Sequence, residues 1–162
     1  MSIILAAILL VICAGIALFL YSPEDFWRRL AGDADLGPVE FATLRKSPKP
    51  NQYLVCPDKL CAYQEPDEVS KIYPYPATIL KERLMAVIGT DIEIVENSDH
   101  AIRFIVRTPT MRFPDTVSIR VFDVVGGSAL AIYSRSKLGY MDFRANETRV
   151  KRWLAALEIR PL

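Results

Sequence analysis

The sequence predicts an α+β fold, with an antiparallel sheet of four to five strands and two helices, preceded by one transmembrane helix. Three observations predict it: an uncharged apolar run at the N-terminus, alternating apolar and polar residues in the second half, and two segments of helical periodicity. The length of 162 residues allows one domain and an appendage. We therefore divide the chain into an anchor (1–21), a Pro-rich neck or linker (22–52) and a globular domain (53–162).

The first element is the apolar run of residues 2–21, which contains no charged side chain. As a helix it would measure about 30 Å, the thickness of the hydrocarbon core of a bilayer. A cleaved signal peptide would have a basic residue before a shorter apolar core, and a lipoprotein signal at Cys13 would have a small residue where Ile12 stands. We expect an uncleaved single-pass anchor that crosses the bilayer through residues 3–21.

Two signals disagree about the side of the membrane on which the domain lies. Arg28 and Arg29 follow the apolar run, and the positive-inside rule would place the domain in the cytoplasm. Cys56 and Cys61 form a close pair, a pattern that usually marks a disulfide in an exported domain, although two reduced structural thiols remain the alternative. We expect the inner (plasma) membrane, with the C-terminal domain on the periplasmic side.

The neck begins with a short segment, DFWRRLAG (residues 25–32), that has two interpretations. It could form an amphipathic helix whose Trp27 lies at the membrane interface. It could equally be a loop whose aromatic side chains fold onto the domain. Both interpretations stay open at this stage.

The domain contains strand-like and helix-like segments in a fixed order. Strand composition or alternation marks residues 52–56, 91–97, 100–109, 115–125 and 128–134, and helical periodicity marks residues 76–88 and 146–157. Residues 91–97 alternate apolar and acidic, which predicts a half-buried strand. Gly126 and Gly127 predict a hairpin turn, and Asn146 is the expected N-cap of the last helix. Successive strands with short turns predict antiparallel pairing, and the helices at both ends predict one covered sheet face.

Charge and motif content exclude several classes of function. Lys and Arg total 20 and Asp and Glu total 19, so the chain lacks the basic excess that nucleic-acid binding requires. The sequence has one histidine, His100, and contains no Gly-rich phosphate loop, zinc signature or nucleotide fingerprint. We therefore expect no nucleic acid partner, no metal site and no cofactor.

A polar motif separates the last strand from the last helix and contains most of the candidate site residues. With the segment before the fourth strand, the candidates for binding are Arg112, Asp115, Ser134, Arg135, Ser136, Asp142, Asn146 and Arg149. The three arginines are expected to converge. One interpretation is a structural corner, with Arg135 or Arg149 paired to Asp115 or Asp142. The other is a binding site for a phosphate, a carboxylate or a lipid headgroup.

Catalysis by the same motif is a third interpretation. Ser134 and Ser136 have no basic partner nearby in the sequence, and neighbouring arginines would keep Asp115 and Asp142 ionised, which suits a proton donor poorly. We therefore assign no catalytic residue. A small-molecule hydrolase or transferase with the Arg/Asp/Ser cluster as its active site remains the alternative function.

Three spaced motifs resemble the domain-of-unknown-function family 1499 (DUF1499). They are RFPD at 112–115, SRSKLGYMD at 134–142 and an Asn146–Arg149 pair that opens the last helix, and VCPDKLC at 55–61 resembles membrane-anchored bacterial members. Arg144 departs from the family pattern, in which glycine is commoner. The resemblance implies domain boundaries and no particular activity. We expect a membrane-tethered, non-catalytic binding or interaction module of the bacterial cell envelope, such as an accessory subunit, whose partner is a membrane protein or an anionic ligand.

Overall fold

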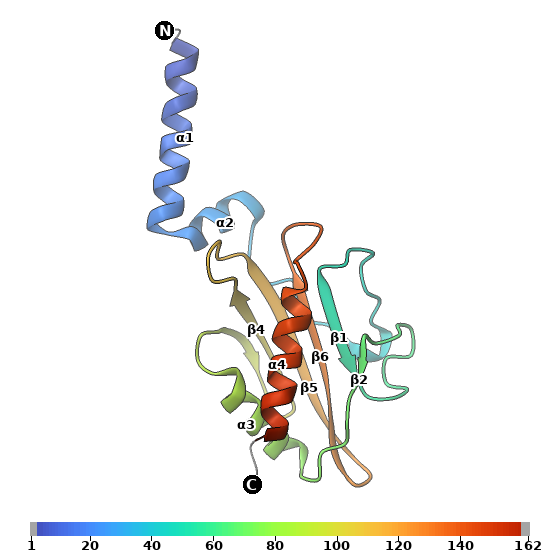
Figure 1. Ribbon diagram of the computed structural model, residues 1–162. Helices are drawn as coiled ribbons and strands as arrows, with labels where there is room; N and C mark the ends of the chain where they lie inside the picture. The colour runs from blue at the N-terminus through green and yellow to red at the C-terminus, as the bar shows by residue number, and fades with distance from the viewer. Residues whose placement is uncertain (1–2, 160–162) are drawn as a thin grey trace.

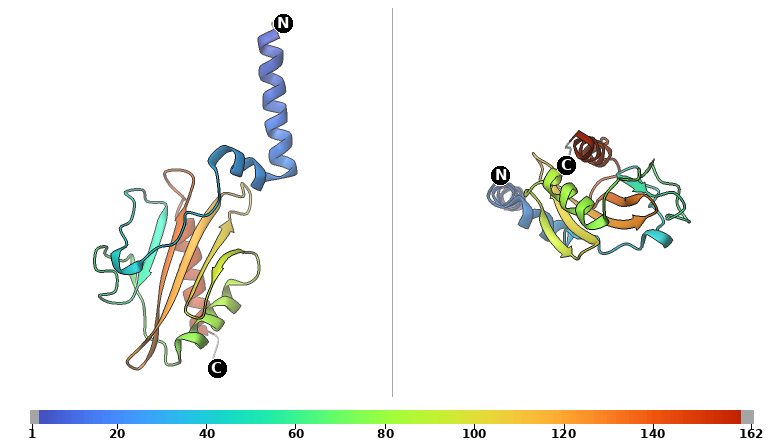
Figure 2. Two further views of the ribbon diagram at one scale, coloured as in Figure 1. Left: turned by 180° about the vertical axis from the view of Figure 1, so that it is seen from behind. Right: turned by 90° about the horizontal axis from the view of Figure 1, so that it is seen from below.

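The structure is a computed structural model and describes residues 3–159, so residues 1–2 of the expected anchor and 160–162 of the expected domain lie outside it (Figures 1 and 2). The helices are α1 (Ile3–Tyr21), α2 (Pro23–Ala31), the 3₁₀-helix η1 (Phe41–Thr43), α3 (Ala77–Ile88) and α4 (Ala145–Ile159). The strands are β1 (Gln52–Cys56), β2 (Glu68–Val69), β3 (Glu93–Asn97), β4 (Ala101–Arg107), β5 (Pro114–Val124) and β6 (Gly127–Ser136).

The described residues form one mixed sheet of six strands in the order β2-β1-β6-β5-β4-β3. The expectation of four to five antiparallel strands is wrong in both respects, because β2 was missed and pairs with β1 in parallel. Strand β2 has only two residues, too few to show a period. Asp67 holds it beside β1: its backbone N–H donates to the Leu54 carbonyl, and its Oδ2 accepts from the Leu54 N–H at 2.8 Å.

Helices α3 and α4 cover one face of the sheet, as the order of the elements predicted (Figures 1 and 2). Alternate residues of β1, β4, β5 and β6 meet the apolar stripes of both helices in this core. Its largest fully buried members include Phe104, Leu80, Leu84, Ile132 and Leu157. The prediction of an α+β domain with helices on one face is therefore confirmed, although α2 adds a helix to the two that were expected besides α1.

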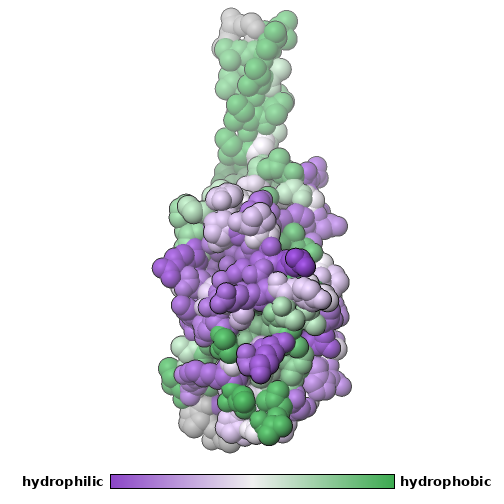
Figure 3. All heavy atoms as spheres, turned by 90° about the vertical axis from the view of Figure 1, so that its right-hand side faces the viewer, coloured by the Kyte–Doolittle hydropathy of each residue, from purple (hydrophilic) through white to green (hydrophobic). Residues whose placement is uncertain are grey.

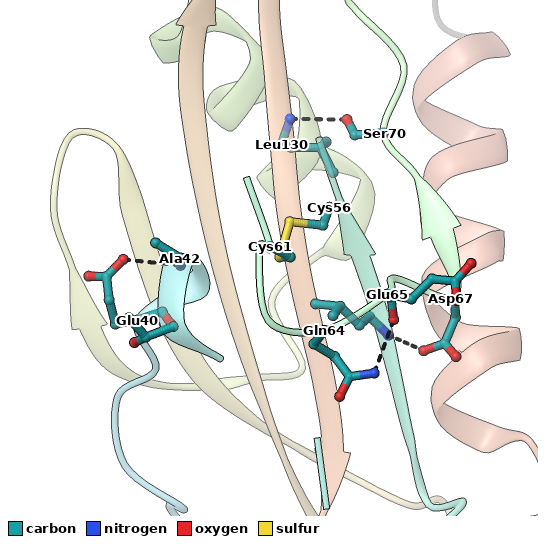
Figure 4. The surroundings of a disulfide bond; sticks show 11 residues. Glu40, Ala42, Cys56, Cys61, Gln64, Glu65, Asp67, Ser70 and Leu130 are labelled. Atoms are coloured by element: carbon teal, nitrogen blue, oxygen red, sulfur yellow. Dashed lines mark hydrogen bonds between the residues drawn. A yellow bond between two sulfur atoms is a disulfide. The ribbon is translucent and has the colours of Figure 1, made fainter. Parts of the chain in front are cut away.

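The opposite face of the sheet is covered by irregular chain. A second apolar cluster there contains Phe41 and Leu44 with the alternate residues of β1 and β6. Cys56, on β1, is joined by a disulfide to Cys61 in the following loop, with a Cα–Cα distance of 6.3 Å (Figure 4). Both sulfur-bearing residues are buried in this cluster.

The neck crosses that same face and bonds to it at several points. The Leu36 N–H donates to Thr116 Oγ1 at 2.9 Å, and Arg135 Nη2 donates to the Gly37 carbonyl at 2.6 Å. Asp35 pairs with Arg103, whose side chain is 13% exposed. Residues 33–44 therefore form a layer of the folded domain.

Two details of the hairpin strands differ from the sequence prediction. Strand β3 is exposed along its whole length, because it lies at the sheet edge, and the expected half-buried pattern is wrong. Val124 pairs with Gly127, so the β5–β6 turn consists of Val125 and Gly126, one residue earlier than predicted. A Cβ on Gly127 would lie 1.9 Å from the Tyr73 carbonyl oxygen, which explains the glycine there.

Helix α1 is long and apolar enough to cross a membrane, judged by length and composition, and none of its residues is buried. Its apolar surface contrasts with the mainly polar face of the domain in Figure 3. Helix α2 follows after Ser22, whose hydroxyl caps it. Trp27 packs on Phe113 at 4.6 Å between ring centroids and donates from Nε1 to the Met111 carbonyl at 2.6 Å. The segment is therefore helical, as one interpretation expected, and its tryptophan folds onto the domain, as the other expected.

Candidate functional site

The candidate residues meet where β5 starts, β6 ends and α4 begins. Cross-strand register places Asp115 opposite Ser136 and Val117 opposite Ser134. Because side chains alternate along a strand, Asp115, Ser134 and Ser136 share the face under α4. Asn146 and Arg149 lie three residues apart on α4, which brings them to the same side of that helix.

A buried ion pair joins α4 to β5. Arg149 Nη2 lies 2.5 Å from Asp115 Oδ2, and the two side chains are 9% and 1% exposed. Arg149 Nη1 also donates to Ser134 Oγ at 3.1 Å and to Asn146 Oδ1 at 3.0 Å. The other carboxylate oxygen, Asp115 Oδ1, is buried and has no hydrogen-bond partner among the described residues. The pair is thus removed from water, and loss of either partner would leave the other side chain buried without its counter-charge.

Asn146 extends this pair into a network that reaches the start of β1. Its Oδ1 accepts from Ser134 Oγ, and its Nδ2 donates to Ser136 Oγ at 2.9 Å and to the Asn51 carbonyl at 3.1 Å. Asn51 in turn donates from Nδ2 to the Gly139 carbonyl at 3.0 Å. We call the side chains of Asn51, Asp115, Ser134, Ser136, Asp142, Asn146 and Arg149 the corner network. Asn51 was missed from the sequence, because it resembles the end of a proline-rich linker.

The first turn of α4 is capped by Asp142, and the expectation that Asn146 caps the helix is wrong. Asp142 Oδ2 accepts from the Asn146 backbone N–H at 2.9 Å, and Oδ1 accepts from the Arg144 N–H at 3.1 Å. Asn146 is the second residue of the helix, so its side chain is free to bond across to β6. Phe143 and Arg144 have φ values of 52° and 64°, the left-handed region in which glycine is favoured.

Arg112 and Arg135 do not join Arg149, which corrects the expected convergence of three arginines. Arg135 follows Ser134 on β6 and therefore lies on the opposite face, where it donates to carbonyls of Leu36 and Gly37. Burial lowers the pKa of its guanidinium. Arg112 bonds to Glu24 of α2 at 2.6 Å, beside the end of α1.

A surface cleft lies beside the corner network, at the start of α4. Its charged lining contains both signs: Lys46, Lys49, Asp67, Asp142, Arg144, Glu147 and Lys151. Hydrogen bonds from Arg144 and then Lys151 hold the pKa of Glu147 at about 2. The acid is therefore ionised at neutral pH. Within residues 3–159 no cluster of three or more His, Cys, Asp or Glu residues has the arrangement of a metal site.

Fold and site together define a small α+β domain carried behind a helix that can cross a membrane, with a buried polar network between sheet and terminal helix. The family model described as "Protein of unknown function (DUF1499)" matches residues 44–157, and the chain belongs to this family. No curated protein and no solved structure matches the chain.

Proposed function

We propose that this protein is a membrane-tethered, non-catalytic interaction module of the bacterial cell envelope, such as an accessory subunit of a membrane protein complex. Helix α1 would be a single-pass anchor in the plasma membrane. The domain would lie on the outer, periplasmic side, where it meets its partner close to the lipid surface.

The observation that carries the proposal is that the polar residues of the corner network bond to one another. Arg149 uses both terminal nitrogens within the corner network, and the hydroxyl of Ser134 donates to Asn146. A guanidinium that binds a substrate anion must face that anion, and a serine that acts as a nucleophile must face its substrate. Here both groups are buried between α4 and the sheet, so they stabilise the fold and leave the outer surface for recognition.

The joint between anchor and domain supports a tethered module. Trp27 and Glu24 of α2 bond to Met111 and Arg112 of the β4–β5 loop, so the domain is attached to the anchor by side-chain contacts as well as by the chain. A tether of this kind restricts the domain to a thin layer above the bilayer and raises the effective concentration of membrane partners.

The disulfide supports an exported domain. Bonded cysteines persist in the periplasm and are rare in the cytosol. The bond between Cys56 and Cys61 therefore favours export over the cytoplasmic placement that Arg28 and Arg29 would indicate. Within α2, Arg28 is paired with Asp25 at 2.6 Å. Alkaline phosphatase and green fluorescent protein fusions at the C-terminus distinguish the two sides: an active phosphatase and a dark fluorescent protein are expected.

Cross-linking in intact membranes tests the interaction role. The tagged full chain would be cross-linked, solubilised and purified, and its neighbours would be identified by mass spectrometry. The control is a tagged chain that ends at residue 32 and keeps α1 and α2. The proposal predicts membrane proteins that are enriched with the full chain and absent with the control. Identical neighbours for both chains would contradict it.

A further inference from the structure

The end of the domain nearest α1 presents a loop with exposed apolar side chains. This β6–α4 loop comprises residues 137–144 and follows directly from the corner network. Figures 1 and 2 show its tip at the level of the domain-side end of α1, close to α2 and to the β4–β5 loop. The loop is tied to that end of the domain, because Lys137 donates to the Pro114 carbonyl and to the Asp33 carbonyl.

The apolar residues of the loop are exposed to a degree that folding does not explain. Tyr140 is 67% exposed, Met141 57% and Phe143 90%, and Met111 of the neighbouring β4–β5 loop is also exposed. The backbone of Phe143 adopts a left-handed conformation that aromatic residues rarely occupy, yet its ring gains no burial in return. Aromatic and methionine side chains that project from one end of a domain are typical of a surface that contacts lipid or a partner.

We propose that the β6–α4 loop inserts its apolar side chains into the interfacial layer of the same bilayer that α1 crosses. The proposal rests on the proposed tether, since only an inserted α1 sets the level of the membrane surface. Ser22 alone separates α1 from α2, so the surface lies close to α2 and hence close to the loop in height. A flexible chain would not be needed to bring the loop to the lipid.

Charged and amphipathic neighbours fit the same occupant. Helix α2 presents an exposed Leu30 beside Arg28 and Arg29, and the first and last residues of the loop, Lys137 and Arg144, are basic. Arg28 is also paired with Asp25, and Arg144 with Glu147. Basic residues around an apolar insertion favour a leaflet that contains anionic headgroups. Asp142 within the loop is directed to the backbone of α4, where it caps the helix.

Depth-dependent quenching on the full chain in liposomes tests the proposal. Cys13 is a free cysteine in α1, and the other two cysteines are bonded, so an environment-sensitive maleimide reports on the anchor in the wild-type chain. Cys13→Ser combined with Phe143→Cys moves the label to the loop. Cys13→Ser combined with Val125→Cys provides the control, since Val125 is 97% exposed at the β5–β6 turn, at the opposite end of the domain (Figure 1).

The liposomes would contain phosphatidylcholine and phosphatidylglycerol with nitroxides at shallow or deep positions. We expect deep nitroxides to quench the label at residue 13, and shallow nitroxides to quench the label at 143 at least about twofold more than at 125. Phe143→Asp should at least halve the shallow quenching of a label at Tyr140→Cys in the Cys13→Ser background, whereas Val125→Asp should leave it unchanged.

The outcomes separate the two proposals. Equal, weak quenching at 143 and 125 with strong quenching at 13 would overturn the docked loop and leave the anchor in place. Absence of quenching at 13 would overturn the anchor itself, and the docked loop with it. A label at 143 that is in water in liposomes and shielded only in native membranes would also overturn lipid docking, because a protein would then cover the loop.

Discussion

Removal of the Asp115 carboxylate is the most informative change to the corner network. Asp115→Ala leaves Arg149 buried with one terminal nitrogen unpaired, while the other keeps its bonds to Ser134 and Asn146. Loss of one partner of a buried ion pair costs about 3–5 kcal/mol, and the two remaining bonds favour the lower end of that range. The expected loss in the free energy of unfolding is therefore about 3 kcal/mol.

This loss is measured on the full chain in detergent micelles by thermal and urea unfolding. Trp153, which is 3% exposed and packs on Phe104, provides a fluorescence signal for the core. For a domain of this size about 3 kcal/mol corresponds to a midpoint lower by roughly 10 °C. Arg120→Ala is the control on the same strand, because Arg120 pairs with Glu40 at the surface, with side chains 45% and 61% exposed. It should cost at most about 1 kcal/mol.

Arg149→Ala provides the complementary result. It leaves the carboxylate of Asp115 buried without a cation, and we expect a loss of similar size. In an anion-binding site, removal of the arginine would leave stability unchanged. If Asp115→Ala and Arg149→Ala both melt within error of Arg120→Ala, the pair is not desolvated and the expected loss of stability is wrong.

Three further predictions concern neighbouring features. Reduction of the disulfide between Cys56 and Cys61, which stand five positions apart in the sequence, should lower the free energy of urea unfolding by about 2 kcal/mol, and a Cys56→Ser/Cys61→Ser chain should no longer respond to reductant. Arg144→Gly should raise the melting midpoint, because φ at this position is 64° and glycine adopts it without strain; a lower midpoint would show that the ion pair with Glu147 matters more. The pKa of Glu147 is lowered to about 2 from 4.5 in the folded protein. The contribution of its ion pairs to the free energy of unfolding is therefore complete above pH 4.5 and lost as the pH falls through 2. In Glu147→Gln the melting midpoint should therefore fall less steeply between pH 4.5 and 2 than in the wild type, by a small amount that salt reduces. The same pH dependence in both proteins would contradict the lowered pKa.

The elements with a clear period were predictable from the sequence. The segment expected as strand 100–109 forms β4, with Ile102 and Phe104 in the core and Arg103 and Arg107 on the other face. The expected helix 146–157 forms α4, with Trp153 buried. In these segments burial of one face determines the conformation, and that face is visible as a repeat in the sequence.

Arg135 lies apart from Arg149 because side chains alternate along β6. Ser134 and Arg135 are neighbours in a strand, and the same alternation that located the strand places them on opposite faces. Applied to the motif, that rule would have separated Arg135 from Arg149 in advance. From the sequence, the partner of Arg149 could be narrowed to Asp115 or Asp142 and no further. Which residue of β5 faces Arg149 of α4 depends on long-range packing of the helix on the sheet.

Other features left no local signal. Strand β2 is two residues long, and Asn51 bonds to residues more than 80 positions away, at Ser136 and Gly139. The path of residues 33–44 over the second sheet face depends on single contacts such as that of Leu36 with Thr116. Such contacts are fixed by the folded sheet and follow no repeat along the chain.

The central claim is that the corner network stabilises the domain and takes no part in chemistry or ligand binding. The direct measurement is cross-linking in intact membranes with the double variant Asp115→Leu/Arg149→Met, which replaces the buried ion pair by apolar side chains. Such replacements are often neutral for stability, and Ser134 and Asn146 can still bond to each other. We expect a melting midpoint near that of the wild type and an unchanged set of domain-dependent neighbours. A folded double variant that has lost those neighbours would contradict it.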